Sequence, residues 1–165
     1  VKNRCEPKLE RIYYDGIEFA SPAPRLISLL DELSDPVDVI LAPSNPFLSL
    51  GPILDIPGMA GLLRERARRI VAVSPIVGGH ALKGPAAKIM SEFSITPTAE
   101  AWMEYLERRY PQLIDVWVWD QLDRKIAEHR PHSSRDIRVT DTVMRNRKGA
   151  QRLAAWLMQE CLDAG

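Results

Sequence analysis

Four short strand-like runs, the middle ones apolar almost throughout and all separated by stretches with helical periodicity, constrain the fold of this chain more than any other feature. The runs cover residues 37–42, 70–73, 113–119 and 137–139. Strands that are apolar almost throughout are typical of a parallel sheet covered on both faces, and helical connections allow such strands to run parallel. The sequence therefore predicts an α/β fold with a Rossmann-like, mostly parallel, doubly wound sheet and helices on both faces. Four strands are too few for a closed barrel.

The segments around these runs predict helices and two irregular regions. Apolar residues recur at helical spacing in 25–33, 59–69, 85–93, 98–110, 122–128 and 151–162, with Thr98 as an N-cap. Five of the 13 prolines lie between Pro36 and Pro57, which predicts a stiff, shaped loop there. Asp15-Gly16 is a favoured hairpin turn, so residues 8–14 and 17–20 predict a short N-terminal β-ribbon.

Composition narrows the class of protein. The 165 residues fit a single α/β domain, with 22 basic and 22 acidic side chains and no net charge. A neutral chain has no overall cationic field to attract nucleic acid or an anionic membrane surface, so neither is expected as a partner. Cys5 and Cys161 form no metal-ligand spacing, and two such thiols suit a reducing, cytoplasmic compartment. The chain begins with Val1 rather than Met, which indicates a piece of something longer.

Small, hydroxylated, glycine or acidic residues follow each predicted strand. They are Pro43-Ser44-Asn45-Pro46 with Ser49 and Gly51, then Ser74 to Gly79, then Asp120 and Asp123, and finally Thr140-Asp141-Thr142. In an open parallel sheet the ligand crevice lies beyond the carboxyl ends of the strands. The four loops therefore predict one binding site at that edge.

The loop after the second run carries the strongest local signal. It connects a strand to a helix that Pro85 can begin, and its glycines, the free N–H groups of the helix start and Lys83 suit a phosphate. It is not a P-loop, because Pro85 stands where the lysine of that motif would be. An ordinary glycine-rich connection is the alternative.

Simpler roles remain open for the other polar residues. Ser44 and Asn45 can cap a turn between prolines, and Asp120 and Asp123 can cap the short helix after the third strand. Arg145, Arg147 and Lys148 form either a ligand clamp or a solvated helix start. No catalytic triad, carboxylate pair or metal-ligand set is evident. The residues alone therefore predict a phosphate-bearing ligand and no specific reaction.

Three longer stretches resemble a known family. Residues 43–54, 74–85 and 140–144, in this order, are similar to motifs of the 2-phospho-L-lactate transferase family (the CofD/FbiA type), which builds coenzyme F(420). Residues 4–7 and 22–24 also match, so the resemblance covers nearly the whole chain. Members of that family are about twice as long, and their amino-terminal half carries a glycine-rich loop with aspartates. The resemblance therefore implies that this chain is the carboxyl-terminal part of a longer transferase.

The resemblance implies a reaction. A guanosine diphosphate-linked three-carbon acid (lactyl, enolpyruvyl or glyceryl) donates its phospho-acid group to the terminal ribityl hydroxyl of the deazaflavin Fo, and GMP leaves. Mg²⁺ is expected, with ligands in the amino-terminal half and none in this chain, and a homodimer is expected. The chain departs from the family at Ala42 and His80, where Gly and Lys are usual, and at Ala87, where Asp is common.

The motifs and the resemblance together predict the site residues. For the nucleotide and its phosphates they are Ser44, Asn45, Pro46, Ser49, Gly51, Ser74, Pro75, Ile76, Val77, Gly78, Gly79, Lys83 and Gly84. For the substrate edge they are Asp120, Asp141 and Thr142, and no catalytic residue is assigned. A non-catalytic nucleotide-binding regulatory module of the same fold is the first alternative. A structural fragment that only pairs with another chain is the second.

Overall fold

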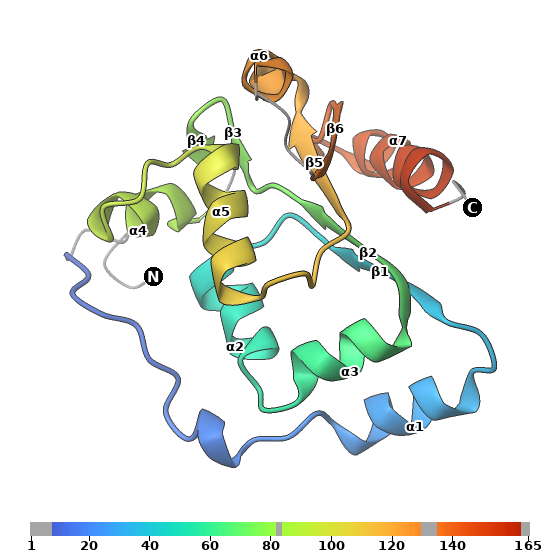
Figure 1. The fold of residues 1–165 in the computed structure, drawn as a ribbon. Coiled ribbons are helices and arrows are strands. Elements are labelled where there is room, and N and C mark those ends of the chain that lie inside the picture. Colours follow the sequence, from blue (N-terminus) through green and yellow to red (C-terminus); the bar gives the residue numbers. More distant parts are fainter. Residues whose placement is uncertain (1–7, 82–83, 130–134, 163–165) are drawn as a thin grey trace.

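Four parallel strands form the centre of the molecule (Figure 1). The computed structural model describes residues 8–81, 84–129 and 135–162. The strands are β1 (Val37–Leu41), β2 (Ala67–Val73), β5 (Val116–Asp120) and β6 (Asp136–Thr140), in the spatial order β1-β2-β5-β6. Each neighbouring pair is parallel, which confirms the predicted α/β class and the four predicted strands.

Helices and short turns connect these strands. The α-helices are α1 (Pro24–Glu32), α2 (Gly51–Leu54), α3 (Met59–Arg66), α4 (Ala86–Glu92), α5 (Ala99–Arg109), α6 (Arg124–Glu128) and α7 (Arg147–Trp156). Tighter or wider helical turns are η1 (Ile17–Phe19), η2 (Pro46–Leu50), η3 (Gln121–Asp123) and η4 (Leu157–Leu162). A small antiparallel sheet pairs β3 (Ile76–Val77) with β4 (His80–Ala81).

The two faces of the sheet carry separate apolar cores, because successive side chains of a strand point to opposite faces. One face carries Ile70, Ala72, Trp117 and Trp119, which pack against residues of η2, α2, α4 and α5. The other carries Val71, Val73, Val116 and Val118, which pack against α7 and η4. Figure 1 shows α5 and α7 on opposite sides of the sheet. The predicted covering of both faces is confirmed.

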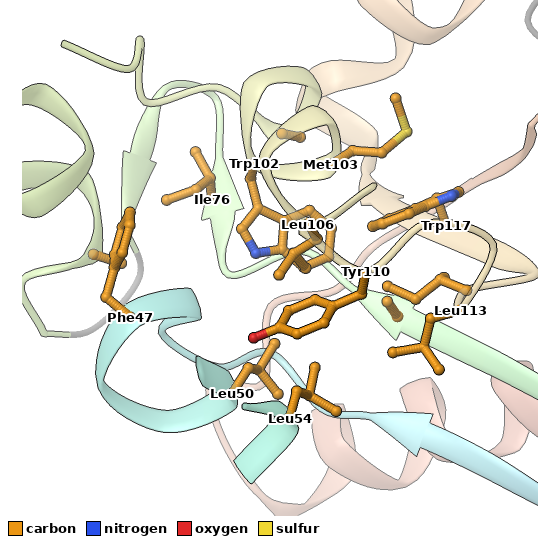
Figure 2. Close-up of a cluster of buried hydrophobic side chains, with 14 of the residues drawn as sticks. Phe47, Leu50, Leu54, Ile76, Trp102, Met103, Leu106, Tyr110, Leu113 and Trp117 are labelled. Carbon is orange, nitrogen blue, oxygen red and sulfur yellow. The ribbon is translucent and has the colours of Figure 1, made fainter. Parts of the chain in front are cut away.

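Aromatic and aliphatic side chains pack together in the larger core (Figure 2). Trp102 of α5 meets Trp117 of β5 edge to face, with ring centroids 5.4 Å apart and an interplanar angle of 88°. Tyr110 directs its hydroxyl toward α2, where it donates to Asp55 at 2.6 Å. Buried aromatic pairs of this geometry contribute about 0.5–1.5 kcal/mol beyond the area they bury. The packing therefore joins α2 and α5 firmly to the sheet.

The predicted N-terminal β-ribbon is wrong. Residues 8–16 form no strand, and Gly16, with a φ of 74°, leads into the helical turn η1. The segment is extended along the core instead: Leu9 and Ile12 pack against the larger core, and the Tyr14 hydroxyl donates to the carbonyl oxygen of Phe47. These contacts with distant residues replace the cross-strand contacts that a ribbon needs.

The predicted stiff loop over residues 36–57 is also wrong, because much of it is helical. The Asn45 side chain accepts hydrogen bonds from the backbone N–H groups of Phe47 (2.8 Å) and Leu48 (3.0 Å), which begins η2. Pro46 and Pro52 lie in the first turns of η2 and α2. Proline is favoured there because the missing N–H has no intrahelical partner to lose.

Two helix boundaries differ from the prediction. The helix expected to reach residue 69 ends at Arg66, because Ala67 is extended and pairs with Val37 of β1. The last helix begins at Arg147 rather than at residue 151, since the Asn146 side chain accepts a hydrogen bond from the Gly149 N–H at 3.0 Å.

No single helix in the described part of the chain is long and apolar enough to cross a membrane. Only the bent pair Pro46–Leu54 and Met59–Arg66, at 78° to each other, satisfies the length and composition criteria together.

Candidate nucleotide site at the carboxyl edge

The parallel sheet brings the four predicted loops to one edge. Leu41 lies opposite Ala72, Val73 opposite Val118, and Asp120 opposite Thr140, so the strands end at similar heights. The segments that follow β1, β2, β5 and β6 therefore lie next to one another along the carboxyl edge, as the sequence predicts. The positions of their side chains differ more from the predictions.

The loop after β1 is organised by Asn45. Its side-chain oxygen caps η2, which agrees with the predicted capping role. Its side-chain nitrogen is buried without a partner among the described residues. Ser44 is half-buried, Pro46 is buried and Ser49 is exposed on η2. Gly51 is buried against the Tyr14 hydroxyl, where a side chain would overlap that oxygen. Gly51 therefore serves packing, whereas Ser44, Asn45 and Ser49 lie nearer to solvent.

The loop after β2 supports a tight turn. Ser74, Pro75, Ile76 and Val77 are buried, and the Ser74 hydroxyl donates to the Ile76 carbonyl oxygen at 2.9 Å. Gly78 and Gly79, with φ of 54° and 80°, form the two-residue turn between β3 and β4. Positive φ at both central positions is the requirement of a type I′ hairpin turn. Gly78 and Gly79 thus form the turn of a short hairpin that precedes α4. The sequence does not predict this hairpin.

The remainder of this loop approaches α4. Gly84 is exposed, with a φ of 70°, and Pro85 occupies the N-cap of α4, one residue before the helix instead of within it. Lys83 lies outside the described residues. The glycines therefore have the backbone conformations that few other residues adopt, and the position of the predicted cation stays a prediction.

Asp120 joins the ends of β5 and β6. It is 1% exposed, and one carboxylate oxygen accepts from the Leu122 N–H at 3.0 Å. The other oxygen accepts from both the N–H (2.8 Å) and the hydroxyl (3.0 Å) of Thr142. Asp120 is therefore the cap of η3, which was one of the predicted alternatives, and it also fixes the loop after β6.

Asp123 is buried at 2% exposure and occupies the N-cap position of α6, but its side chain makes no capping hydrogen bond there. Its two carboxylate oxygens lie 3.1 and 3.2 Å from the Gly78 nitrogen and accept that N–H. Burial raises the pKa of the Asp123 carboxyl, the charge of Asp120 raises it further, and the Gly78 N–H opposes both. No sequence signal links positions 78 and 123, so this contact is the main feature of the site that the sequence analysis missed.

Replacing Asp123 with asparagine is expected to leave the folded state at least as stable at pH 7. Because the raised pKa favours the protonated carboxyl, its contribution to stability is present below the ordinary carboxyl pKa and is lost as pH rises through the raised value. The asparagine amide is neutral and can still accept the Gly78 N–H, so this decline should disappear. Urea denaturation between pH 4 and pH 8 tests this, and a loss above about 1 kcal/mol at pH 7 would contradict it.

The loop after β6 forms a cavity with the start of α7. The Asp141 carboxylate accepts from the Val143 N–H at 3.1 Å and pairs with Arg152 at 2.8 Å. A cavity of about 430 Å³ is lined by Asp141, Val143, Arg145, Asn146, Lys148, Gly149 and Arg152. Arg145 and Lys148 are exposed, so they lie at the surface of a helix start and also border this cavity. Asp141 itself is engaged in holding the loop and Arg152.

The described residues hold no cluster of three metal-ligating side chains. Across residues 8–81, 84–129 and 135–162, no three His, Cys, Asp or Glu side chains lie close enough to hold a metal. The two buried carboxylates at the edge, Asp120 and Asp123, accept backbone N–H groups, and a cation in those positions would face the N–H donors. Asp120 and Asp123 are therefore both engaged by N–H donors of the protein itself.

Comparison with known proteins agrees with the motifs at this edge. Residues 1–158 match the model of the family described as 2-phospho-L-lactate transferase CofD.

The chain belongs to the 2-phospho-L-lactate transferase family.

Members of this enzyme family from several organisms are similar to it. The 2-phospho-L-lactate transferase of Methanocaldococcus jannaschii is 32% identical over 98% of this chain and 48% of that protein. The enzyme of the same name from Methanopyrus kandleri is 36% identical over 93% of this chain and 46% of that protein. The phosphoenolpyruvate transferase of Mycobacterium sp. strain KMS is 34% identical over 72% of this chain and 35% of that protein. The chain thus spans about half the length, or less, of these relatives.

Proposed function

We propose that this chain is the carboxyl-terminal part of a transferase in coenzyme F(420) biosynthesis. The complete enzyme moves a phosphorylated three-carbon acid from a guanosine diphosphate-linked donor to the terminal ribityl hydroxyl of Fo and releases GMP. The relatives' names supply two such acids, phospholactate for the Methanocaldococcus protein and phosphoenolpyruvate for the Mycobacterium one. The transferred acid therefore differs within the family, and its identity in this enzyme is left open.

One observation supports this proposal most. The three stretches that carry the family resemblance are distant in sequence, but all follow strands that end at the same edge of the sheet. That edge is where parallel α/β sheets bind ligands. A family motif that served only packing would have no reason to gather there.

The donor's diphosphate is assigned to the glycine-rich side of this edge. The Gly78 N–H already donates a hydrogen bond to Asp123, while no described residue accepts one from the Gly79 N–H. The diphosphate therefore lies against Gly79, Lys83 and Gly84 in this proposal. The guanosine end extends toward Ser44, Asn45 and Ser49.

Phosphoryl-group transfer of this kind depends mainly on in-line placement and on spreading phosphate charge, usually with Mg²⁺. Since no group of three metal-ligating side chains lies together among the described residues, we assign the Mg²⁺ ligands to the part of the enzyme beyond this chain.

We also expect a homodimer, because the sheet has an edge strand that a second copy could cover. This strand is β1, and its Ile40 is 39% exposed.

Two titrations of the complete enzyme test the function. Addition of Fo should change the deazaflavin fluorescence, and GDP should bind in the same preparation. GDP binding without any response to Fo would instead support the non-catalytic nucleotide-binding module. Absence of both responses would contradict the proposal and leave a structural role.

Replacing Lys83 with alanine is expected to weaken GDP binding about tenfold, since an ammonium group near a diphosphate forms a charge-assisted contact. Lys88→Ala is the matched control, because Lys88 lies on the adjacent helix α4 and pairs with Glu92. Isothermal titration calorimetry on the complete enzyme measures both. Equal affinity in the wild type and Lys83→Ala would remove Lys83 from the site.

A further inference from the structure

Two buried aspartates connect three of the loops at the carboxyl edge. Asp123, after β5, reaches back to Gly78 in the segment after β2. Asp120, three residues earlier, holds Thr142 in the loop after β6. Since Asp120 caps η3 and Asp123 is its last residue, one short turn sets the positions of the loops on either side of it.

Packing alone does not explain a carboxylate at position 123. The side chain is 2% exposed, and no ion pair to it is found among the described residues. Burying a charge without a cation is unfavourable. What position 123 supplies is therefore an acceptor for the Gly78 N–H, a role that a neutral acceptor could also fill, and not a gain in overall stability.

The partner is the exposed turn of a short hairpin whose first strand is buried. The hairpin consists of two strands of two residues each, β3 and β4, which supply few backbone hydrogen bonds of their own. Gly78 is exposed at its tip, so the hairpin's own packing does not cover that residue. The Asp123 contact joins this tip to the sheet across 45 residues of sequence.

We propose that Asp123 is a positioning residue for the donor nucleotide: its carboxylate holds the Gly78–Gly79 turn where the donor's diphosphate binds. Asp120 has a similar positioning role, because it accepts hydrogen bonds from Thr142 in the loop after β6. This inference rests on the proposed function, because it assumes that the diphosphate lies beside this turn. Asp123 touches no reacting atom in this proposal and acts only through the backbone of Gly78.

The test compares two aspartates that make the same kind of contact at opposite edges. Asp115, just before β5, accepts the Ile70 N–H at 2.7 Å and pairs with Arg64 at 2.9 Å. Like Asp123, it ties a residue next to β5 to the β2 segment, but at the amino edge. Asp115→Ala therefore reports what the loss of such a link does to stability alone.

GDP affinity and unfolding are measured for each variant in the complete enzyme. We expect Asp123→Ala to weaken GDP binding about tenfold, and Asp123→Asn, which keeps an acceptor for Gly78, to stay within threefold of the wild type. Asp115→Ala should also stay within threefold, even where its midpoint of unfolding falls as far as that of Asp123→Ala. This pattern separates positioning of the turn from general loss of structure.

Several results would overturn the inference. Unchanged GDP affinity in Asp123→Ala would do so, as would an equal loss in Asp115→Ala. If Asp123→Ala does not fold, Asp123→Glu replaces it: the longer side chain misplaces the carboxylate and should weaken GDP binding at least threefold, and unchanged affinity would refute the proposal. Failure of the wild type to bind GDP would contradict the proposed function itself, and it would be seen before any variant is made.

Discussion

Replacing Gly51 with alanine is expected to lower the free energy of unfolding by about 2–3 kcal/mol. A Cβ atom at this position would overlap the Tyr14 hydroxyl and lie 2.9 Å from the carbonyl oxygen of Pro46. The backbone at Gly51 is ordinary right-handed helix, with a φ of −54°, so the loss comes from crowding and not from backbone strain. Urea denaturation of the wild type and the variant measures the difference.

Gly61→Ala provides the control for this substitution. Gly61 also lies in a helix, α3, but a Cβ there meets no atom within 4 Å. Alanine should therefore raise stability at position 61 by about 0.5–1 kcal/mol through helix propensity. A Gly51→Ala variant that gained stability in the same way would show that Tyr14 does not pack against Gly51.

A double-mutant cycle locates the crowding. Tyr14→Phe removes the hydroxyl and its hydrogen bond to the Phe47 carbonyl oxygen, which should cost about 1 kcal/mol. In the Tyr14→Phe background, Gly51→Ala should cost less than in the wild type, because the overlapping oxygen is gone. Additive losses would assign the crowding to Pro46 alone. The contact holds the N-terminal segment on η2, which bears Ser49 and begins at its N-cap Asn45, two residues of the proposed nucleotide site.

The sequence predicts the sheet well because a buried strand requires apolar residues at consecutive positions, and this pattern can be recognised locally. The central strands β2 and β5 carry apolar runs, since both of their faces are covered by separate cores. The intervening helices make the strands parallel, and parallel strands place their following loops at one edge. All of this depends on periodicity within a few residues, which is why the class and the position of the loops could be inferred.

The errors occur where a local signal competes with contacts from elsewhere in the chain. Asp15-Gly16 is a good hairpin turn, but Tyr14 bonds to Phe47, so no ribbon forms. The prolines at 46 and 52 resemble loop formers, although both lie in first turns of helices, where proline fits. In each case the deciding partner is not adjacent in sequence.

The same limit applies to the candidate site. Glycines after a buried strand correctly indicate special backbone conformations, and Gly78 and Gly79 have them. The sequence predicts that Gly78 and Gly79 face a phosphate, whereas in the structure the Gly78 N–H donates to Asp123. A carboxylate at position 123 offers no sign of its partner, since its spacing from Asp120 also suits a helix cap.

Replacing Asp120 with alanine is expected to lower the free energy of unfolding by about 3 kcal/mol, because it leaves two buried donors without an acceptor. Thr142 is fully buried, and both its N–H and its hydroxyl donate to one oxygen of Asp120. The same substitution removes the acceptor for the Leu122 N–H that begins η3. Urea denaturation measures the loss, and weaker GDP binding should accompany it because η3 also carries Asp123.

Two smaller substitutions determine how that loss is divided. An asparagine side chain offers one acceptor oxygen where the carboxylate offers two, so Asp120→Asn can satisfy Leu122 or Thr142 but not both, and about half of the loss should remain. Thr142→Val removes only the hydroxyl contact and should cost about 1 kcal/mol. The expected order of destabilisation is therefore Asp120→Ala, then Asp120→Asn, then Thr142→Val. An Asp120→Ala variant no less stable than Thr142→Val would mean that water replaces the carboxylate, and that the ends of β5 and β6 are held together by strand pairing alone.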